Sequence, residues 1–138
     1  MPDTELALLI DRFMRRIHFG LQAKAAGFDK ENVGPGGGII LLTIADMGRP
    51  EMSELTRRVS RDKSQMTRTI RTLENKGLVE RQVSPSDARV SLVSLTPAGE
   101  TVVAHLRGAV TDTINEILGP VSPADRDTLR RVLQGALC

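Results

Sequence analysis

The sequence is poor in aromatic residues, in cysteine and in long apolar runs. It has no Trp, no Tyr and three Phe among 138 residues, so its core must be built from aliphatic side chains. Its one cysteine, Cys138, excludes an internal disulfide framework and a zinc site of several cysteines, and it fits a reducing compartment. The apolar run at 6–10 is too short for a secretory signal or a membrane span. We therefore expect a soluble, cytoplasmic protein with no membrane contact.

The usual sequence signatures of enzymes and metal sites are also missing. The two histidines, His18 and His105, have no cysteine pair or clustered carboxylates at ligand spacing, which argues against a bound metal. The glycine-rich string at 34–38 lacks the Gly-Lys-Ser/Thr of a phosphate loop and is more simply interpreted as a loop, with a helix starting near Gly36. We therefore expect no enzymatic activity and no cofactor.

Hydrophobic periodicity predicts a single, mainly α domain with one two-stranded ribbon. The length of 138 residues suits one domain with a real core. Helices are expected over 4–27, from about 36 to 48, and over 51–59, 63–76, 97–118 and 123–137, with strands over 79–83 and 90–95. Alternation in the second strand is imperfect, which indicates either a bulge or burial on both faces. A short helix, a turn, a basic helix and a ribbon follow one another in the order used by proteins that read duplex DNA.

The basic helix has clear signals at both ends. Asp62 is a good N-cap, and Gln65 three residues later completes a capping box. Lys76 and Gly77 end the helix with a basic last turn and a residue that tolerates the left-handed conformation.

This helix has one apolar and one polar face. At 100° per residue, Met66, Ile70 and Leu73 fall in a narrow arc that should face the core. The polar side chains carry the donors and acceptors that suit base edges in a major groove, although a merely solvated helix face is the simpler alternative. The candidates for the major groove are Ser64, Gln65, Thr67, Arg68, Arg71, Thr72 and Asn75.

Positive charge is concentrated in the middle of the chain. The net charge is only +2, but 49–89 contains ten Lys or Arg against six Asp or Glu, whereas the rest contains nine against eleven. Such a cluster suits a phosphate backbone. The candidate backbone contacts are Ser53, Arg57, Arg58, Arg61 and Lys63.

The tip of the ribbon provides a second candidate contact. Arg89 could enter a minor groove, and Asp87 two residues earlier could hold the guanidinium by a charge-assisted bond. The alternative is an ordinary turn in which Asp87 accepts from backbone amides, and the local sequence does not decide between the two.

Four stretches together resemble the MarR family of bacterial transcription regulators: 53–55, 62–68, 73–81, and 87–89 with 95–99. The resemblance implies a winged helix-turn-helix module over 30–97, flanked by N- and C-terminal dimerisation helices over 1–29 and 97–138. It implies that the helix from Lys63 reads the major groove of double-stranded DNA while the wing with Arg89 reaches the minor groove. Ala88 departs from the basic residue that the family often has there, which predicts weaker wing affinity.

Dimerisation also has a physical argument. A first helix of about 36 Å and the two C-terminal helices carry more apolar surface than the small central module could cover, so a second copy is the natural partner. Two such helices about 34 Å apart would match a short inverted repeat.

The resemblance further implies a small anionic or phenolic effector. Arg16, His18 and Lys24 are the candidate ligand residues, although each also has a simpler explanation as surface charge, boundary residue or snorkelling chain. Redox sensing is disfavoured, because some relatives sense oxidants through a cysteine near the N-terminus and the one cysteine of this sequence is Cys138. The main alternative function is a winged-helix module for protein interaction or for non-specific nucleic-acid binding.

Overall fold

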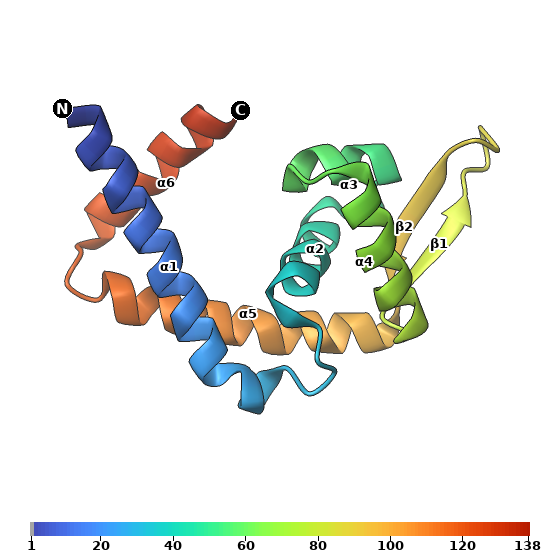
Figure 1. Cartoon of the computed structure of the whole chain (residues 1–138), viewed down its shortest axis with the longest axis horizontal. Coiled ribbons are helices and arrows are strands. Elements are labelled where there is room, and N and C mark those ends of the chain that lie inside the picture. The colour runs from blue at the N-terminus through green and yellow to red at the C-terminus, as the bar shows by residue number, and fades with distance from the viewer. Residues whose placement is uncertain (1) are drawn as a thin grey trace. The chain divides into compact units, whose positions relative to one another are not determined.

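The computed structural model describes residues 2–138, which form six helices and one antiparallel ribbon (Figure 1). The elements are α1 Pro2–Phe28, α2 Gly34–Met47, α3 Met52–Val59, α4 Lys63–Asn75, β1 Val79–Val83, β2 Ser91–Leu95, α5 Pro97–Leu118 and α6 Pro123–Leu137. These bounds confirm the predicted order and type of elements. Within residues 2–138, no helix is both long and apolar enough to cross a membrane.

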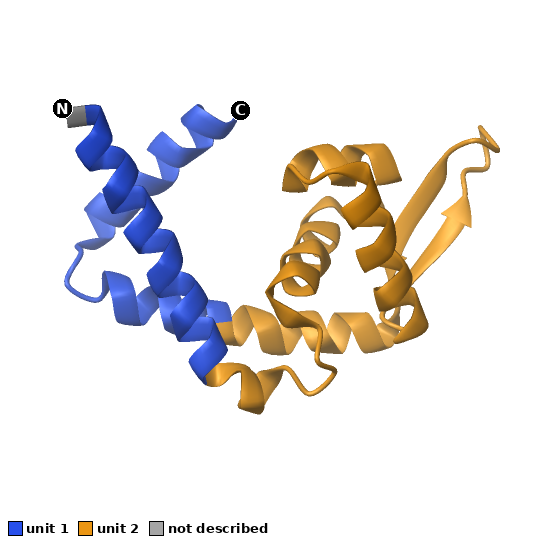
Figure 2. Ribbon diagram, in the orientation of Figure 1, with its two compact units in different colours: residues 1–23, 110–138 blue, residues 24–109 orange. Residues whose placement is uncertain are grey.

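The chain divides into two compact units, coloured separately in Figure 2. Unit 1 comprises 1–23 and 110–138, and unit 2 comprises 24–109. Unit 2 contains α2, α3, α4, the ribbon and the first half of α5, which is the arrangement of a winged helix-turn-helix. This division reflects which residues contact one another and does not test function. The boundaries of the DNA-binding module, expected at 30 and 97, therefore stay predictions.

The core of unit 2 is aliphatic, as the shortage of aromatic residues predicts. Its members come from α2, α3, α4, the turn before β1, the ribbon and the first half of α5, and the phenylalanines are all in α1. The predicted apolar arc of α4 is buried, with Met66, Ile70 and Leu73 at most 1% exposed. The other fully buried side chains of this core are Ile40, Leu41, Ile44, Leu55, Leu78 and Val93.

The ribbon has an unbroken register from Val79 opposite Leu95 to Val83 opposite Ser91, so the bulge alternative is wrong. Val93 is buried on one face while Leu92 is half-buried on the other, which accounts for the imperfect alternation. The free edge of β2 is partly covered, because the Val93 amide donates to the Pro50 carbonyl at 2.9 Å. The ribbon is therefore anchored to the segment between α2 and α3.

The interpretation of the glycine string as a loop is wrong, because α2 begins at Gly34. Asp29 supplies the missing cap: its carboxylate accepts from the Val33 amide at 2.8 Å and from the Gly34 amide at 2.9 Å. Two of the glycines allow close packing. A Cβ on Gly37 would lie 2.6 Å from Val33 Cγ1, and one on Gly38 would lie 3.2 Å from Leu106 Cδ2. Close packing against Val33, just before α2, and against Leu106 of α5 therefore overrides the low helix propensity of glycine.

Unit 1 leaves many apolar side chains uncovered. Its α1 and α5 segments approach closely, since a Cβ on Gly20 would lie 2.7 Å from Thr113 Cγ2. The Arg126 guanidinium ties α6 to the end of α5 by donating to Asn115 Oδ1 at 2.9 Å and to the Leu118 carbonyl at 2.7 Å. Even so, none of the residues of α6 is buried. The large exposed apolar side chains of this unit are Leu6, Leu8, Leu9, Ile10, Met14, Phe19, Leu129, Val132, Leu133 and Leu137.

Candidate nucleic-acid interface

The start of α4 is fixed by its predicted cap. The Asp62 carboxylate accepts from the Gln65 amide at 2.8 Å, which satisfies one of the free donors of the first turn. At the other end, Gly77 adopts a positive φ of 74° and stops the helix. The capping box predicted for Asp62 and Gln65 is found instead on α3, where the side chains of Glu51 and Glu54 each accept a backbone amide. The acidic residues that flank α3 and α4 are thus engaged with backbone.

The polar face of α4 is accessible. Of the seven candidates for the major groove, only Thr67 is half-buried and the other six are exposed. The hydroxyl of Thr67 donates to the Lys63 carbonyl at 2.9 Å, and that of Thr72 donates to the Arg68 carbonyl at 3.0 Å. Because both hydroxyl protons are used inside the helix, these two threonines are less ready to donate to a nucleic acid. The side chains best placed for that role are Ser64, Gln65, Arg68, Arg71 and Asn75.

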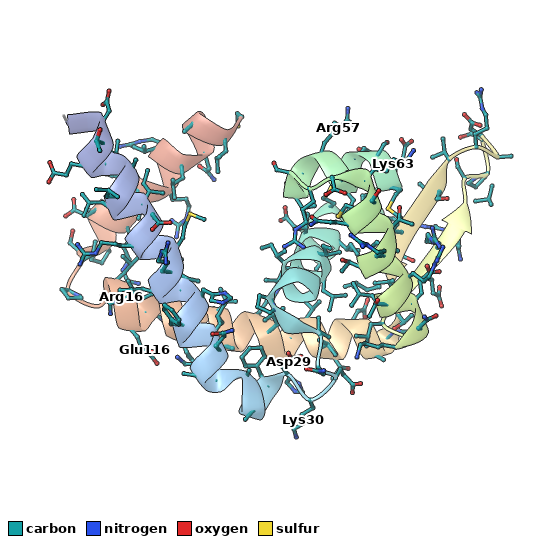
Figure 3. All side chains as sticks on the ribbon, in the orientation of Figure 1. Arg16, Asp29, Lys30, Arg57, Lys63 and Glu116 are labelled. Carbon is teal, nitrogen blue, oxygen red and sulfur yellow. The ribbon has the colours of Figure 1, made fainter. Side chains whose placement is uncertain are left out.

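Most candidate cations have no carboxylate partner. Within the part of the chain that the structure describes, no ion pair involves Arg57, Arg61, Lys63, Arg68 or Arg71. In Figure 3, Arg57 of α3 and Lys63 of α4 lie on the same side of unit 2. Their positive charge is therefore available to an external anion.

Two of the predicted backbone contacts are less free than the others. Arg58 Nη1 lies 3.4 Å from Asp46 Oδ2, so its charge is partly offset by an exposed ion pair. Arg61 is half-buried beside α2, since a Cβ on Gly36 would lie 3.0 Å from its Nη1. The glycine thus leaves room for the guanidinium. Ser53, in the first turn of α3, is exposed as predicted.

At the tip of the wing, Asp87 makes both of the contacts considered from the sequence, one with the Arg89 guanidinium and one with a backbone amide. Its carboxylate accepts from Arg89 Nε at 3.2 Å and from Nη2 at 3.3 Å, and it also accepts from the Arg89 amide at 3.0 Å. These bonds to Arg89 lower the pKa of Asp87 below its ordinary value of 3.8, with the side-chain bond as the main cause. The Arg89 side chain is nevertheless 90% exposed. The wing therefore presents a guanidinium that is already oriented but still open to solvent.

The wing is attached to α4 by a contact that periodicity could not reveal. Arg81 Nε of β1 lies 2.9 Å from Glu74 Oε1 of α4, and the two side chains are only 33% and 27% exposed. The Leu78 amide adds a backbone bond to the Leu73 carbonyl at 3.0 Å. Opposite charges seven residues apart across a turn were the one signal of this pair in the sequence. As a result, the wing has a fixed position relative to the polar face of α4.

The structure places the candidate effector residues without completing a site. Arg16 and His18 are exposed on α1 in unit 1, and Lys24 is half-buried on α1 in unit 2. The imidazole of His18 packs edge-on to Phe19, with ring centroids 6.0 Å apart. Cys138 is exposed. Among residues 2–138, no three His, Cys, Asp or Glu side chains gather where they could hold a metal ion. The role of the three effector candidates stays a prediction.

Residues 39–91 match the model of the MarR family. The fold matches a cysteine-to-serine mutant of MarR from E. coli complexed with operator DNA, with a TM-score of 0.80 and 25% identity over 97% of this chain and 94% of that one. Residues 39–91 therefore carry the sequence pattern of the MarR family, and nearly the whole chain has the fold of MarR.

Two curated proteins described as transcriptional regulators are similar as well. A protein from Thauera aromatica, described as a transcriptional regulatory protein for the hcr operon, is 32% identical over 104 residues, or 75% of this chain and 63% of that protein. The uncharacterized HTH-type transcriptional regulator YdgJ of Bacillus subtilis is 35% identical over 81 residues, or 59% of this chain and 49% of that protein. The chain thus spans about three fifths of the length of the first relative and half of the length of the second.

Proposed function

We propose that this protein is a MarR family transcription regulator that binds a short inverted repeat in double-stranded DNA as a homodimer. The observation that carries the proposal is the polar face of α4, which is exposed and bears arginines without carboxylate partners within residues 2–138. A helix with that face suits the major groove, because arginine, asparagine and glutamine can each form two bonds to a purine edge. The regulators among its relatives and the operator complex of MarR support the same function.

The contacts divide into two kinds. Arg68, Arg71 and Asn75 project from the middle and end of α4 and are proposed to read bases. Ser53, Arg57 and Lys63 come from the first turns of α4 and from α3, and they are proposed to hold phosphates. The braced Arg89 of the wing is proposed to enter the neighbouring minor groove, where a narrow groove attracts a guanidinium.

A homodimer is proposed because unit 1 exposes apolar side chains on both α1 and α6. A stable monomer rarely leaves so many large apolar side chains in water. A second copy would cover them and would carry a second reading helix. The target would then contain two half-sites about one helical turn apart.

We further propose that a small anionic or phenolic effector modulates DNA binding. The support is the family resemblance, with Arg16, His18 and Lys24 as the candidate contacts. Such an effector can act only if it binds the DNA-incompetent arrangement more tightly than the competent one.

The test is binding-site selection from a random duplex library with the purified protein. The proposal expects enrichment of an inverted repeat, with affinity that falls as salt rises. Salt-sensitive binding without sequence preference would instead indicate an architectural nucleic-acid protein. The absence of any duplex binding would leave a protein-interaction module as the function of the winged helix.

A further inference from the structure

The wing strand β1 is held on both of its faces, just before the tip of the wing. Alternate side chains of a strand point to opposite faces, so Arg81 shares the face of Val79 and Gln82 lies on the other face. Of the five residues of β1, only Val79 is buried. Apolar packing therefore holds the first residue of β1, and any side-chain restraint further along this strand must be polar.

The first restraint is the ion pair with α4. Arg81 Nε lies 2.9 Å from Glu74 Oε1. That oxygen is buried from solvent and has no hydrogen-bond partner among residues 2–138, so the guanidinium is the charge that compensates it. Water and salt screen such a pair less than an exposed one, and removal of one partner would leave the other poorly compensated. The pair therefore resists movement of β1 away from α4.

The second restraint joins the other face of β1 to the segment between α2 and α3. Arg49 Nη2 donates to Gln82 Oε1, and the carbonyl of the next residue, Pro50, accepts from the Val93 amide of β2 at 2.9 Å. The helix α3, which carries proposed phosphate contacts, begins two residues later. The Arg49–Gln82 bond is exposed, so we expect it to be the weaker of the two restraints. The ribbon is thus tied to α4 on one face and to the start of α3 on the other.

The tip of the wing depends on these two restraints for its position. Within residues 2–138, the hydrogen bonds and the ion pair of 84–90 are all made inside the tip itself. Arg89 is therefore positioned only through the two strands. Three strand residues span about 10 Å, so a rotation of about 20° at Arg81 would move the tip by about 3.5 Å. That displacement is close to the rise of about 3.4 Å per base pair.

We infer that Glu74 and Arg49 are positioning residues that clamp the wing strand from both faces and fix the direction of the wing. They thereby set the number of base pairs between the minor-groove contact of Arg89 and the base contacts of α4. This consequence for spacing rests on the proposed function, because it needs sequence-specific binding to duplex DNA. The clamp itself is a property of the free protein.

The clamp is tested first without DNA, by ¹H–¹⁵N residual dipolar couplings of the full chain. In the wild-type protein, the amides of α4, β1 and β2 should fit one alignment tensor, because the two restraints hold these elements as one body. Glu74→Met removes the carboxylate and keeps a side chain of similar length, so the couplings of β1 and β2 should no longer fit the tensor of α4. Arg49→Gln should cause a smaller deviation of the same kind.

Asp46→Asn is the matched control for these variants. It removes the carboxylate of another ion pair between elements, the one that joins Asp46 of α2 to Arg58 of α3 without contacting the wing. The couplings of α4, β1 and β2 in this variant should therefore equal those of the wild-type protein.

The spacing is tested on the duplex obtained by binding-site selection. Replacement of single adenines by 2,6-diaminopurine adds an amino group to the minor groove and leaves the major groove unchanged. One such replacement in each half-site should weaken wild-type binding about tenfold, and the same replacement one base pair away should have little effect. In Glu74→Met this difference should fall to about twofold, because a wing that samples both positions does not distinguish them. A variant that had merely lost stability would keep the difference.

Wing couplings that stay unchanged in both Glu74→Met and Arg49→Gln would overturn the clamp, as would equal changes in Asp46→Asn. Altered couplings together with an unchanged difference between neighbouring base pairs would refute the control of spacing. A protein that selects no inverted repeat would fail the proposed function, and the control of spacing with it. The couplings are measured without DNA, so they decide the clamp in either case.

Discussion

Gly99→Ala should damage the junction between the wing and α5. Gly99 is buried in the first turn of α5, and a Cβ there would lie 2.0 Å from the carbonyl oxygen of Leu78. That oxygen accepts from the Thr96 amide at 3.1 Å, and the Thr96 hydroxyl donates to the Gly77 carbonyl at 2.6 Å. The obstacle is backbone rather than a flexible side chain, so the added methyl must displace this hydrogen-bonded turn.

The expected cost follows from three contributions. Overpacking costs about 1–3 kcal/mol, and the rigid neighbour puts this site near the upper end. Weakening the Thr96–Leu78 hydrogen bond costs about 1 kcal/mol more. The higher helix propensity of alanine offsets about 1 kcal/mol of this loss in stability. We therefore expect Gly99→Ala to lower the free energy of unfolding by about 3 kcal/mol.

Gly108→Ala is the matched control, because it makes the same substitution in the same helix. A Cβ at Gly108 would meet nothing within 4 Å, so the variant should be stabilised by up to about 1 kcal/mol. Urea unfolding followed by circular dichroism, at one fixed protein concentration, measures both changes. Unchanged stability in Gly99→Ala, or equal shifts in both variants, would refute the packing argument.

Three further outcomes are expected. Arg68→Ala should relax base preference and cost about 1–3 kcal/mol of discrimination, whereas Arg57→Ala should weaken binding to all duplexes equally and flatten its salt dependence. Quantitative binding to selected and scrambled duplexes measures both effects, and a uniform loss of affinity in both variants would contradict this division. NMR titration of the side-chain carboxyl should give Asp87 a pKa below 3.8 that returns toward 3.8 in Arg89→Ala. The Asp87–Arg89 contact is therefore fully present above pH 3.8 and is lost as the pH falls through the lowered pKa. An unchanged pKa in the variant would refute this contact. Leu133→Asp should shift the protein from dimer to monomer in analytical ultracentrifugation, since it places a charge on the uncovered face of α6, and a variant that stays dimeric would remove that face from the interface.

The sequence predicted the elements well where local chemistry decides them. Asp62 and Gly77 bound α4 as expected, and Met66, Ile70 and Leu73 are buried because helical periodicity alone places them on one face. It failed at 34–38 because the low helix propensity of glycine takes no account of the contacts made there. The cap comes from Asp29, five residues before Gly34, and a Cβ on Gly36 or Gly38 would crowd Arg61 or Leu106, which lie far away in the sequence.

The sequence predicted which types of residue form the candidate site, but not which side chains pair with one another. The polar face of α4 follows from spacing along the chain. The sequence left a contact between Asp87 and Arg89 and an ordinary turn as alternatives, and the structure has both. The Glu74–Arg81 ion pair and the Arg49–Gln82 bond join different elements, so they needed the fold. The same holds for Arg58, whose pairing with Asp46 across twelve positions reduces its value as a phosphate contact.

The proposed function requires that α4 reads base edges in the major groove. The most direct measurement is the affinity of wild-type protein and Arg68→Ala for the selected duplex, with single purines replaced by their 7-deaza analogues. That replacement removes the N7 acceptor from the major groove and leaves the minor groove unchanged. We expect at least one replacement in each half-site to weaken wild-type binding, and Arg68→Ala no longer to respond to one of them. If no replacement changes the affinity of the wild-type protein, α4 does not read purine edges and the proposed base reading is wrong.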